Sequence, residues 1–539
     1  RQGAVTELFS DLVMREELSH LLSNVLDLER LMTKVVYGTA NGKDLRAIAS
    51  TVAVIPEIKA LLASVGSTEL ASLRDNTDSL QDIYSVIENM LVENPPFSIR
   101  EGGMIKDGYN SDIDYLRSVM NDGKGWITKI EEKERTETGI KTLKIGYNRV
   151  FGYYIEVTKS LVSQVPERYI RKQTLANCER YITEELKNME ATVLGASDKL
   201  CSLEYDVFIA LRNHLADNLK RIQKSANMLA KLDVYVSLAE VAMKNNYVCP
   251  EVDYSDVIDI KDGRHPVVEQ FVKDSYFVPN DTYLNTTSNR LMLITGPNMA
   301  GKSTYMRQSA LIVVMAQIGS FVPAKDARIG VVDKLFTRVG ASDDLASGQS
   351  TFMLEMTEVA YILANATKRS FIVYDEIGRG TSTFDGMSIA KAIAEYTASK
   401  KIGAKTMFAT HYHELTSLED ECDGVVNYNI AAKKRGEDII FLRKIIKGPT
   451  DDSYGIEVAK LAGVPSEVVK RAKAVLAEMI KDGHSPVKKS IQTEIPMEMS
   501  FEDVGIYEVA DKIKKTDINT LTPIEAMNFI FELKKILGN

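Results

Sequence analysis

The sequence predicts a multidomain protein: an α-helical region that carries a β-rich insert, then an α/β domain and a C-terminal helical segment. Residues 1 to about 121 repeat apolar side chains at spacings of three and four, which is typical of amphipathic helices. The stretch KTLKIGYNRVFGYYIEVTKS, residues 141–160, alternates and is rich in Tyr, Ile, Val and Thr, which favours strands. From Tyr247 to about Ile446, strand-like and helix-like runs alternate, as in an α/β domain.

Composition limits the classes of protein that the chain can represent. Its 539 residues suffice for about three to five domains, and 45% hydrophobic with 26% charged residues is ordinary for a globular protein. The net charge of −9 means that any surface for nucleic acid must be local. The four cysteines form no C-x-x-C pair, so we expect neither a zinc nor a disulfide framework and infer a reducing, cytoplasmic setting. No apolar run approaches the roughly 18 residues of a membrane span, so we expect no membrane partner.

The helical regions have predicted breaks and ends. The chain begins at RQGAVTELF without Met, and we expect it to be a fragment of a longer protein. Helix is expected to return from about Leu175 to Asn245, a proline-free stretch long enough for a rod. Residues 482–500 are polar and contain proline, which predicts a linker, and Pro523–Leu537 predicts a last helix. In the first helical region, breaks are expected at residues 38–42, at Gly66 and at Pro95–Pro96.

A glycine-rich loop lies near the middle of the chain. GPNMAGKS, Gly296–Ser303, fits the phosphate-loop pattern G-x-x-x-x-G-K-[ST], between the buried-strand run LMLIT and the helical run YMRQSALIVVMAQIG. In that context, backbone N–H groups and the helix N-terminus can hold anionic phosphates. Lys302 would then neutralise the outer phosphates, and the Ser303 hydroxyl would ligate Mg²⁺. The predicted nucleotide-binding residues of this loop are Gly296, Pro297, Asn298, Met299, Ala300, Gly301, Lys302, Ser303 and Thr304.

Two carboxylates follow a second predicted strand. Phe371–Tyr374 is a short apolar run suited to a central parallel strand, and it places Asp375 and Glu376 at the strand's carboxyl end, where α/β domains bind ligands. Asp375 can hold Mg²⁺ there, directly or through water. Glu376 can orient and deprotonate the attacking water, which makes it a candidate catalytic base.

A histidine follows a third predicted strand. Thr406–Ala409 is another short apolar run, and His411 comes two residues after it. Its imidazole could contact the γ-phosphate or the lytic water, so His411 is a second catalytic candidate. Alternatively, His411 and His413 form half of a metal site, although no third ligand has a suitable spacing.

The stretch GASDDLASGQSTFMLEMTEVAYIL, residues 340–363, is a polar loop that runs into an amphipathic helix. We expect Ser350 or Thr351 to cap that helix, with Glu355 in its first turn. The pattern predicts at least a helix cap. A loop this polar between buried elements would also suit the nucleotide of a second subunit.

The β-rich insert is locally basic. From Lys141 to Lys187 there are nine Lys or Arg, five Glu and no Asp. A basic, strand-rich tip on an acidic protein suits contacts with DNA phosphates that do not read sequence, although such a run is more often a solvated face. The candidate DNA-binding residues are Lys141, Lys144, Arg149, Lys159, Arg168, Arg171, Lys172 and Arg180.

These stretches, in this order, resemble the MutS family of DNA mismatch-repair ATPases, bacterial type, which belongs to the wider ABC-type ATPase class. The blocks that carry the resemblance are TGPNMAGKSTYMRQ, DDLASGQSTFMLEM, DEIGRGTSTFDG and FATHYHEL. It extends upstream through YIRKQTLANCERYITEEL and GRHPVVE and downstream through YGIEVAKLAGVPSEVVKRA, so it covers essentially the whole chain.

The resemblance implies an ATPase that uses ATP and Mg²⁺ in a homodimer with composite sites. Asn298 would touch the γ-phosphate or its lytic water, as a third catalytic candidate. Ser350 would reach the other subunit's nucleotide. Phe277 would stack on adenine, unless it is a core residue. Tyr454–Lys473 resembles a helix-turn-helix that braces the dimer.

The resemblance also implies the domain layout. Leu521–Leu537 resembles a C-terminal association helix, which would pair with another copy, giving a tetramer, or else pack on its own domain. The predicted domains are a helical lever in two parts, 1–121 and 181–246, a DNA clamp insert, 122–180, an ABC-type ATPase domain with the helix-turn-helix, 247–481, and a linker with the association helix, 482–539.

The implied function is an ATP-dependent dimeric clamp on double-stranded DNA, whose ATP binding and hydrolysis control clamping, sliding and repair signalling in the bacterial cytoplasm, at the nucleoid. MutL and a sliding clamp are implied partners with no residues assigned. The family's mismatch-reading domain, with its Phe-x-Glu motif, and its connector would precede this sequence, so we assign mismatch sensing to none of its residues. The alternative is a nucleotide-switched clamp for branched or recombining DNA without mismatch recognition.

Overall fold

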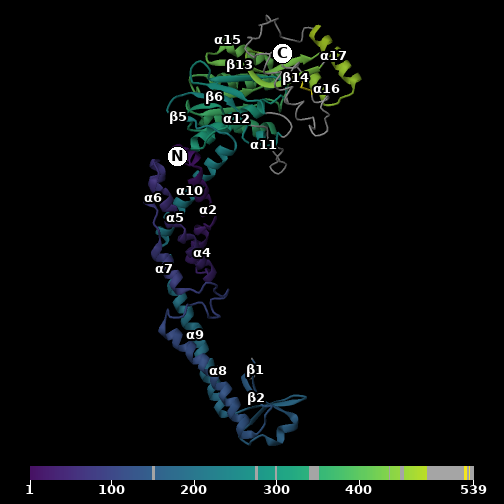
Figure 1. The fold of residues 1–539 in the computed structure, drawn as a ribbon. Helices are drawn as coiled ribbons and strands as arrows, with labels where there is room; N and C mark the ends of the chain where they lie inside the picture. The colour runs from purple at the N-terminus through teal and green to yellow at the C-terminus, as the bar shows by residue number, and fades with distance from the viewer. Residues whose placement is uncertain are drawn as a thin grey trace. The chain divides into compact units, whose positions relative to one another are not determined.

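The computed structural model of the chain forms two compact units (Figure 1), the first from Gly3 to Glu240 and the second from Val241 onward. The residues that the structure describes are 1–148, 152–272, 277–297, 300–338, 351–435, 438–449 and 455–481, with the helical residues Met527, Phe529, Ile530 and Leu533.

The first unit is mainly helical. The predicted breaks at residue 66 and at residues 95–96 fall between helices and are confirmed. The break predicted at 38–42 is confirmed for residues 38–41, because α4 already begins at Gly42. Asn41 and Asp44 form a capping box at the start of α4, which satisfies N–H groups that the helix itself cannot. The elements before the insert are α1 (Gln2–Ser10), α2 (Leu12–Ser23), α3 (Leu28–Val36), α4 (Gly42–Ala53), α5 (Ile55–Leu61), η1 (Leu62–Ser64), α6 (Thr68–Asn76), α7 (Gln81–Met90) and α8 (Ser111–Thr138).

Among the described residues, one helical stretch is long and apolar enough to cross a membrane, which differs from the sequence analysis. It is Gly42–Ser64, with a mean hydropathy of 1.5, and it passes by length and composition only. The stretch comprises α4, α5 and η1, with Pro56 in the first turn of α5. Because α4 buries Leu45 and Ile48 and contacts α7, packing within the helical unit accounts for the apolar composition.

The β-rich insert is an antiparallel four-stranded sheet in the order β1-β2-β4-β3. It lies at the end of the long helices α8 and α9 (Glu184–Asp217), which contact each other (Figure 1). Its elements are β1 (Lys144–Asn148), β2 (Gly152–Thr158), η2 (Lys159–Gln164), β3 (Ile170–Thr174) and β4 (Cys178–Ile182).

The edges of the insert differ from the predicted ones. Helix α8 continues to Thr138, although the sequence analysis places 122–138 in the insert, and it ends at Gly139, whose left-handed φ of 71° suits glycine. The helix predicted from Leu175 begins only at Glu184, because the preceding residues form β4. The predicted rod is two helices, α9 and α10 (Leu219–Lys244).

Three carboxylates from the two helices fasten the insert. Glu131 of α8 accepts a hydrogen bond from the Ile145 backbone N–H at 2.7 Å. The buried Glu134 of α8 accepts one from the Tyr169 hydroxyl at 2.7 Å. Glu190 of α9 accepts one from a backbone N–H of β2 at 3.2 Å. The sheet is therefore held to the helices by directed polar contacts as well as by its apolar core.

The second unit contains two sheets. In the larger sheet, with the order β10-β11-β12-β8-β13-β14, all neighbours are parallel except β13 and β14. Its strands are β8 (Leu291–Thr295), β10 (Leu335–Arg338), β11 (Phe371–Asp375), β12 (Lys405–Ala409), β13 (Val425–Arg435) and β14 (Asp438–Lys447). The smaller sheet, in the order β5-β9-β6-β7, comprises β5 (Glu251–Asp253), β6 (Ile258–Gly263), β7 (Asn280–Leu284) and β9 (Asp326–Gly330).

Helices cover both faces of the larger sheet, so its central strands are buried on both sides. Met292 and Ile294 of β8 pack in a cluster with α12, whereas Leu291 and Leu293 pack in a cluster with α13 and α14. This explains the continuous apolar run, and the predicted order strand, loop, helix is confirmed. The helices are α11 (Val268–Phe271), α12 (Lys302–Ile318), α13 (Thr351–Asn365), α14 (Thr383–Ala398), η3 (His413–Ser417), α15 (Leu418–Glu421), α16 (Gly455–Leu461) and α17 (Ser466–Lys481).

The C-terminal predictions are only partly covered. Helices α16 and α17, joined by residues 462–465, form a helix-turn-helix where the sequence analysis expects one. The predicted linker, 482–500, lies outside the described residues. Of the predicted last helix, the four described residues are helical.

Candidate nucleotide site and basic insert

The phosphate loop joins β8 to α12 in a geometry that needs glycine. Gly296 follows the strand with φ 132° and Gly301 precedes the helix with φ 108°, both in the left-handed region. Within the described residues, no side chain caps α12, so its first N–H groups are available for an anion. Of the other predicted loop residues, Ala300 is buried, Pro297, Ser303 and Thr304 are half-buried, and Asn298 and Met299 lie outside the described residues.

Lys302 is the buried cation of this loop. Its side chain is 3% exposed, its Nζ donates a hydrogen bond to the Gly296 carbonyl, and it lies 3.9 Å from Glu376 Oε1. Burial lowers the pKa of Lys302 to about 8, while Glu376 and Asp375 oppose that shift. The lysine is thus held at the loop, close to the two carboxylates predicted to act with it.

The two carboxylates lie at the carboxyl end of β11. Asp375 Oδ1 is buried and has no hydrogen-bond partner in the described part of the chain. Glu376 has φ 57°, a left-handed conformation that is costly for a residue with a side chain, and its backbone N–H donates to the Ala409 carbonyl at 3.0 Å. Its carboxylate forms an ion pair with Arg379, which the sequence analysis missed although the spacing of three is a local signal.

His411 follows the end of β12, the strand that pairs with β8 in the sheet. Its Nδ1 is buried and has no hydrogen-bond partner among the described residues. Burial, followed by Arg379, Lys302 and His413, lowers its pKa to about 4. The imidazole is therefore neutral near pH 7, so one ring nitrogen can donate a hydrogen bond at the site and the other can accept one. The described residues contain no cluster of three or more potential metal ligands to complete a site with His413.

Phe277 lies in a different part of the second unit, before strand β7 of the smaller sheet. It is half-buried in the segment that leads into β7. That segment is tied to β14: Asn280 accepts a hydrogen bond from the Ile445 N–H at 2.8 Å, and Lys444 donates to the Pro279 carbonyl at 2.8 Å. These contacts hold residues 279 and 280 beside β14, and stacking of Phe277 on adenine stays a prediction.

The polar loop before α13 lies outside the described residues, and Ser350 with it. Helix α13 begins at Thr351, and Glu355 lies beyond the first turn, contrary to the prediction. Glu355 is buried and accepts a hydrogen bond from the Gly378 N–H at 2.6 Å. The prediction that Glu355 stabilises the first turn of α13 is therefore wrong. Instead, Glu355 joins α13 to the loop after β11.

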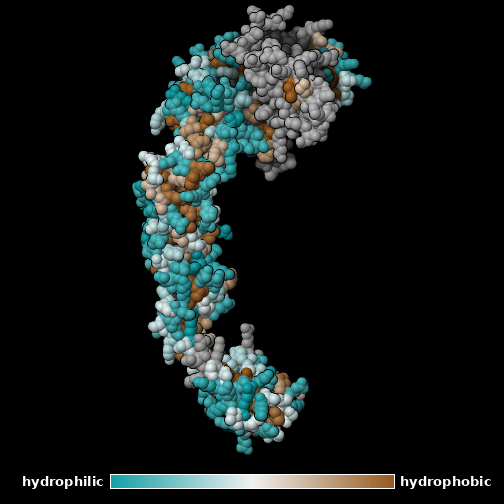
Figure 2. Space-filling model, in the orientation of Figure 1, coloured by the Kyte–Doolittle hydropathy of each residue, from teal (hydrophilic) through white to brown (hydrophobic). Residues whose placement is uncertain are grey.

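The candidate DNA-binding cations fall into two groups. Arg168 pairs with Glu134 at 2.5 Å and with Glu137 at 2.7 Å, and Arg180 pairs with Glu156 at 3.1 Å and lies over the Tyr154 ring. These pairings join residues up to 34 apart, which charge counting misses. Five further candidates are exposed: Lys141, Lys144, Lys159, Arg171 and Lys172. Arg168 is exposed as well, although it is paired, and Arg171 lies 4.0 Å from Glu179. Arg149 lies outside the described residues. The visible face of the insert is predominantly hydrophilic (Figure 2).

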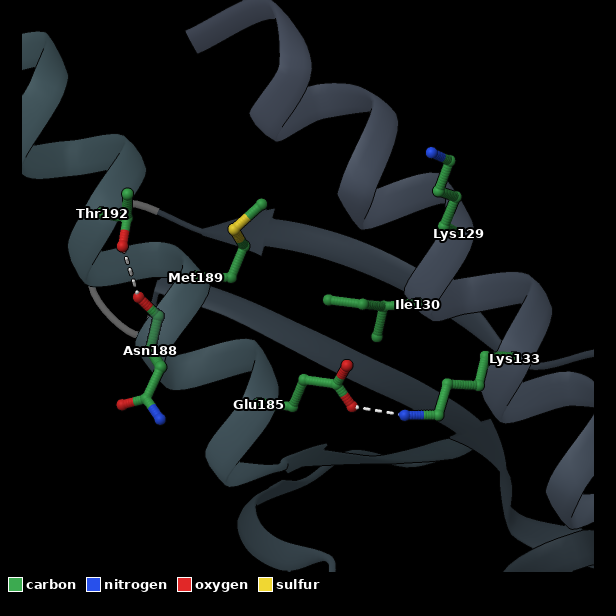
Figure 3. Close-up of a pocket in the computed structure, with 7 residues that line it drawn as sticks. All are labelled: Lys129, Ile130, Lys133, Glu185, Asn188, Met189 and Thr192. Atoms are coloured by element: carbon green, nitrogen blue, oxygen red, sulfur yellow. Dashed lines mark hydrogen bonds and ion pairs between the residues drawn. The ribbon is translucent and has the colours of Figure 1, made fainter. Parts of the chain in front are cut away.

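A cavity of about 430 Å³ lies between α8 and α9 at the insert (Figure 3). Lys133 and Glu185 form an ion pair of 2.9 Å across it. Ile130 and Met189 point toward each other from the two helices and form a small apolar cluster. These contacts hold the helices together beside the sheet.

Comparison with known proteins decides the family. Residues 292–480 match the model described as MutS domain V, and residues 108–199 match MutS family domain IV. The chain is 54% identical over 544 residues to the DNA mismatch repair protein MutS of Acetivibrio thermocellus, covering 99% of this chain and 62% of that protein. It is 54% identical over 547 residues to the protein of that name from Ruminiclostridium cellulolyticum, covering 100% and 63% respectively.

The chain belongs to the MutS family. The domain V match contains the phosphate loop, both carboxylates and His411, and the domain IV match contains α8, the insert and the start of α9. The chain spans less than two thirds of the length of these MutS relatives.

Proposed function

We propose that the chain is the ATP-hydrolysing, DNA-holding part of a MutS mismatch-repair protein. One observation carries the proposal: the phosphate loop, the Asp375–Glu376 pair and His411 lie at the carboxyl ends of neighbouring parallel strands, where α/β domains bind ligands. The names of the relatives support mismatch repair over the alternative of a clamp for branched DNA.

The residues fit ATP hydrolysis. The loop N–H groups and Lys302 hold the phosphates, and Glu376 orients and deprotonates the attacking water. His411, neutral at pH 7, holds a proton at the γ-phosphate side. The Ser303 hydroxyl and Asp375 supply the oxygen ligands that Mg²⁺ prefers, and this is supported by the buried Asp375 Oδ1, which has no hydrogen-bond partner among the residues that the structure describes. Bound Mg²⁺ would neutralise charge on the phosphates.

The finer parts of the proposal follow from the family. Asn298 senses the γ-phosphate, Phe277 stacks on adenine, and Ser350 reaches the nucleotide of a second copy in an ABC-type dimer. The exposed cations of the insert hold double-stranded DNA by its phosphates. MutL and a sliding clamp act downstream, in the bacterial cytoplasm at the nucleoid.

The test is DNA binding and phosphate release by the same preparation. Matched and mismatched duplexes are titrated with the chain, with and without ATP and Mg²⁺, beside Lys302→Ala. We expect equal affinity for both duplexes, an affinity that ATP changes, and loss of that change in Lys302→Ala, because nucleotide and DNA binding are linked.

Three results would contradict the proposal. Phosphate release no faster than in Lys302→Ala would contradict the proposed ATP hydrolysis. A DNA affinity that is the same with and without ATP would contradict the coupling between nucleotide binding and DNA binding. Tighter binding to a four-way junction than to either duplex would favour the branched-DNA alternative.

A further inference from the structure

Tyr412 contacts both His411 and the loop that carries Glu376. It follows His411 directly, and its ring packs against the imidazole with a centroid distance of 4.4 Å and an interplanar angle of 38°. Tyr412 is 6% exposed, and its hydroxyl donates a hydrogen bond to the Gly378 carbonyl at 3.0 Å. Gly378 comes two residues after Glu376. One side chain therefore reaches one catalytic candidate with its ring and the loop of the other with its hydroxyl.

This hydrogen bond is the second of two that join the loop after β11 to the segment after β12. The first runs from the Glu376 N–H to the Ala409 carbonyl at 3.0 Å. Ala409 precedes His411 and Tyr412 follows it, so the loop is tied on both sides of the imidazole. Glu376 has φ 57°, a costly conformation that persists only where surrounding contacts hold it. The two hydrogen bonds are contacts of that kind.

The Tyr412 hydroxyl is closely packed. A Cβ on Gly386, near the start of α14, would lie 2.6 Å from the hydroxyl oxygen. The Tyr412 N–H donates to the Thr410 hydroxyl at 3.0 Å, and the Thr410 N–H donates to the Ile294 carbonyl of β8 at 3.0 Å. Burial raises the pKa of Tyr412, so its hydroxyl remains a donor near pH 7. The hydroxyl thus lies against α14, and the backbone that carries it is tied to β8 through Thr410.

We propose that Tyr412 is a positioning residue that holds the Glu376 carboxylate and the His411 imidazole in a fixed mutual arrangement. The proposal rests on the ATP hydrolysis proposed above. The hydroxyl keeps the loop in the conformation that directs Glu376 to the attacking water, and the ring fixes the plane of the imidazole. Tyr412 acts through these two groups and transfers no proton itself, because hydrolysis depends on how accurately they are placed.

The test separates the hydroxyl from the ring in the full chain. Tyr412→Phe removes the hydroxyl alone, and Tyr412→Leu removes the ring as well. Tyr428→Phe is the matched control: the Tyr428 hydroxyl accepts a hydrogen bond from Asn289 at 2.7 Å, and Asn289 precedes β8, whereas the phosphate loop follows it. For each variant, kcat, the equilibrium Kd for ATP and the Tm are measured. Tyr412→Phe is also combined with Glu376→Gln, and single-turnover phosphate release is compared with that of Glu376→Gln alone.

We expect a separation of kcat from binding. Tyr412→Phe should lower kcat by about tenfold, because a displacement of about 1 Å in a catalytic group costs up to about 100-fold, with Kd for ATP within about threefold. Tyr412→Leu should lower kcat further, and Tyr428→Phe should keep the kcat of the parent chain. Added to Glu376→Gln, Tyr412→Phe should change the rate by less than about twofold, because the group that the hydroxyl positions is already disabled. If Tyr412→Leu fails to fold, Tyr412→Phe decides.

Three results would overturn the proposal. A kcat for Tyr412→Phe equal to that of Tyr428→Phe would show that the hydroxyl positions nothing. The same fractional loss with Glu376 present or replaced would show that Tyr412 does not act through Glu376. A joint fall in kcat, ATP affinity and Tm in Tyr412→Phe, beyond the fall in Tyr428→Phe, would show a role in folding alone. Absence of hydrolysis in the parent chain, measured against Lys302→Ala, would instead overturn the ATPase function and with it this inference.

Discussion

The phosphate-loop site and the β insert both contain charged side chains, but these are buried in the site and exposed to solvent on the insert. In the site, the Lys302 side chain is 3% exposed and lies 3.9 Å from Glu376. In the insert, the Arg171 side chain is 65% exposed and lies 4.0 Å from Glu179. Burial strengthens each electrostatic interaction in the site, whereas water and salt weaken each one on the insert.

Because of this difference, we expect the replacement of one residue to have a larger effect in the site than on the insert. In the buried site, one group does one task, and a neighbour cannot take it over. On the insert, the proposed contacts with DNA phosphates would add up from many small contributions, so we expect the number of exposed cations to matter more than their identity. The predictions below test this contrast.

The largest effect is expected from Glu376→Gln. The amide fills the same space but cannot take a proton from water, so kcat should fall by about 10² to 10⁴-fold while ATP still binds. Phosphate release and the equilibrium Kd for ATP measure the two quantities. Unchanged turnover would remove Glu376 as the base.

A triple reversal on the insert should act next most strongly. Lys159, Arg171 and Lys172, all changed to Glu, should weaken duplex binding about 10- to 100-fold and flatten its salt dependence, because phosphate contacts release counterions. The matched control reverses the exposed Lys220, Lys224 and Lys231 of α10, with the same change in net charge. Equal losses in both variants would show that only net charge matters.

The pH dependence of ATP binding should follow Lys302. Its pKa of about 8 means that the free site holds the cation below pH 8 and loses it above. Because phosphate binding requires the proton, Kd for ATP should rise about twofold from pH 7 to 8 and approach a tenfold rise per unit above pH 9. Duplex affinity in the same buffers is the control. A flat Kd from pH 7 to 10 would contradict the prediction.

The smallest effect on binding is expected from Arg168→Gln. It leaves the buried Glu134 without its cation, so stability should fall by about 1–3 kcal/mol, while duplex affinity falls less than in the triple reversal. Urea unfolding and DNA titration measure both. A loss of duplex affinity as large as the triple reversal's, at full stability, would place Arg168 on the DNA surface.

Sequence reasoning found the features that short motifs encode. The phosphate loop, the strand before Asp375 and the strand before His411 are contiguous patterns, and each was correctly placed by its own residues. The extent of α8 was not predicted, because Gly123 and Gly125 interrupt its pattern, yet pairing with α9 continues the helix. The fold class was thus predictable at the level of elements, but less so at their boundaries.

Contacts between distant residues were the other gap. Glu355 meets Gly378 across 23 positions, and Arg168 meets Glu134 across 34, and neither spacing leaves a local pattern. The sequence analysis therefore treated Glu355 as part of a helix end and Arg168 as a surface cation. The partner of a carboxylate on the buried face of a helix is set by the tertiary fold, so it cannot be predicted from the neighbouring residues in the sequence.

The carboxylates that fasten the insert also have a mechanical consequence. Contacts from Glu131, Glu134 and Glu190 join the sheet to both α8 and α9, at several separate points. A joint fixed at several points resists bending and twisting far better than a single tether. A pull on the strands would therefore reach the two helices as a torque along their length, with the insert and helices moving as one stiff arm.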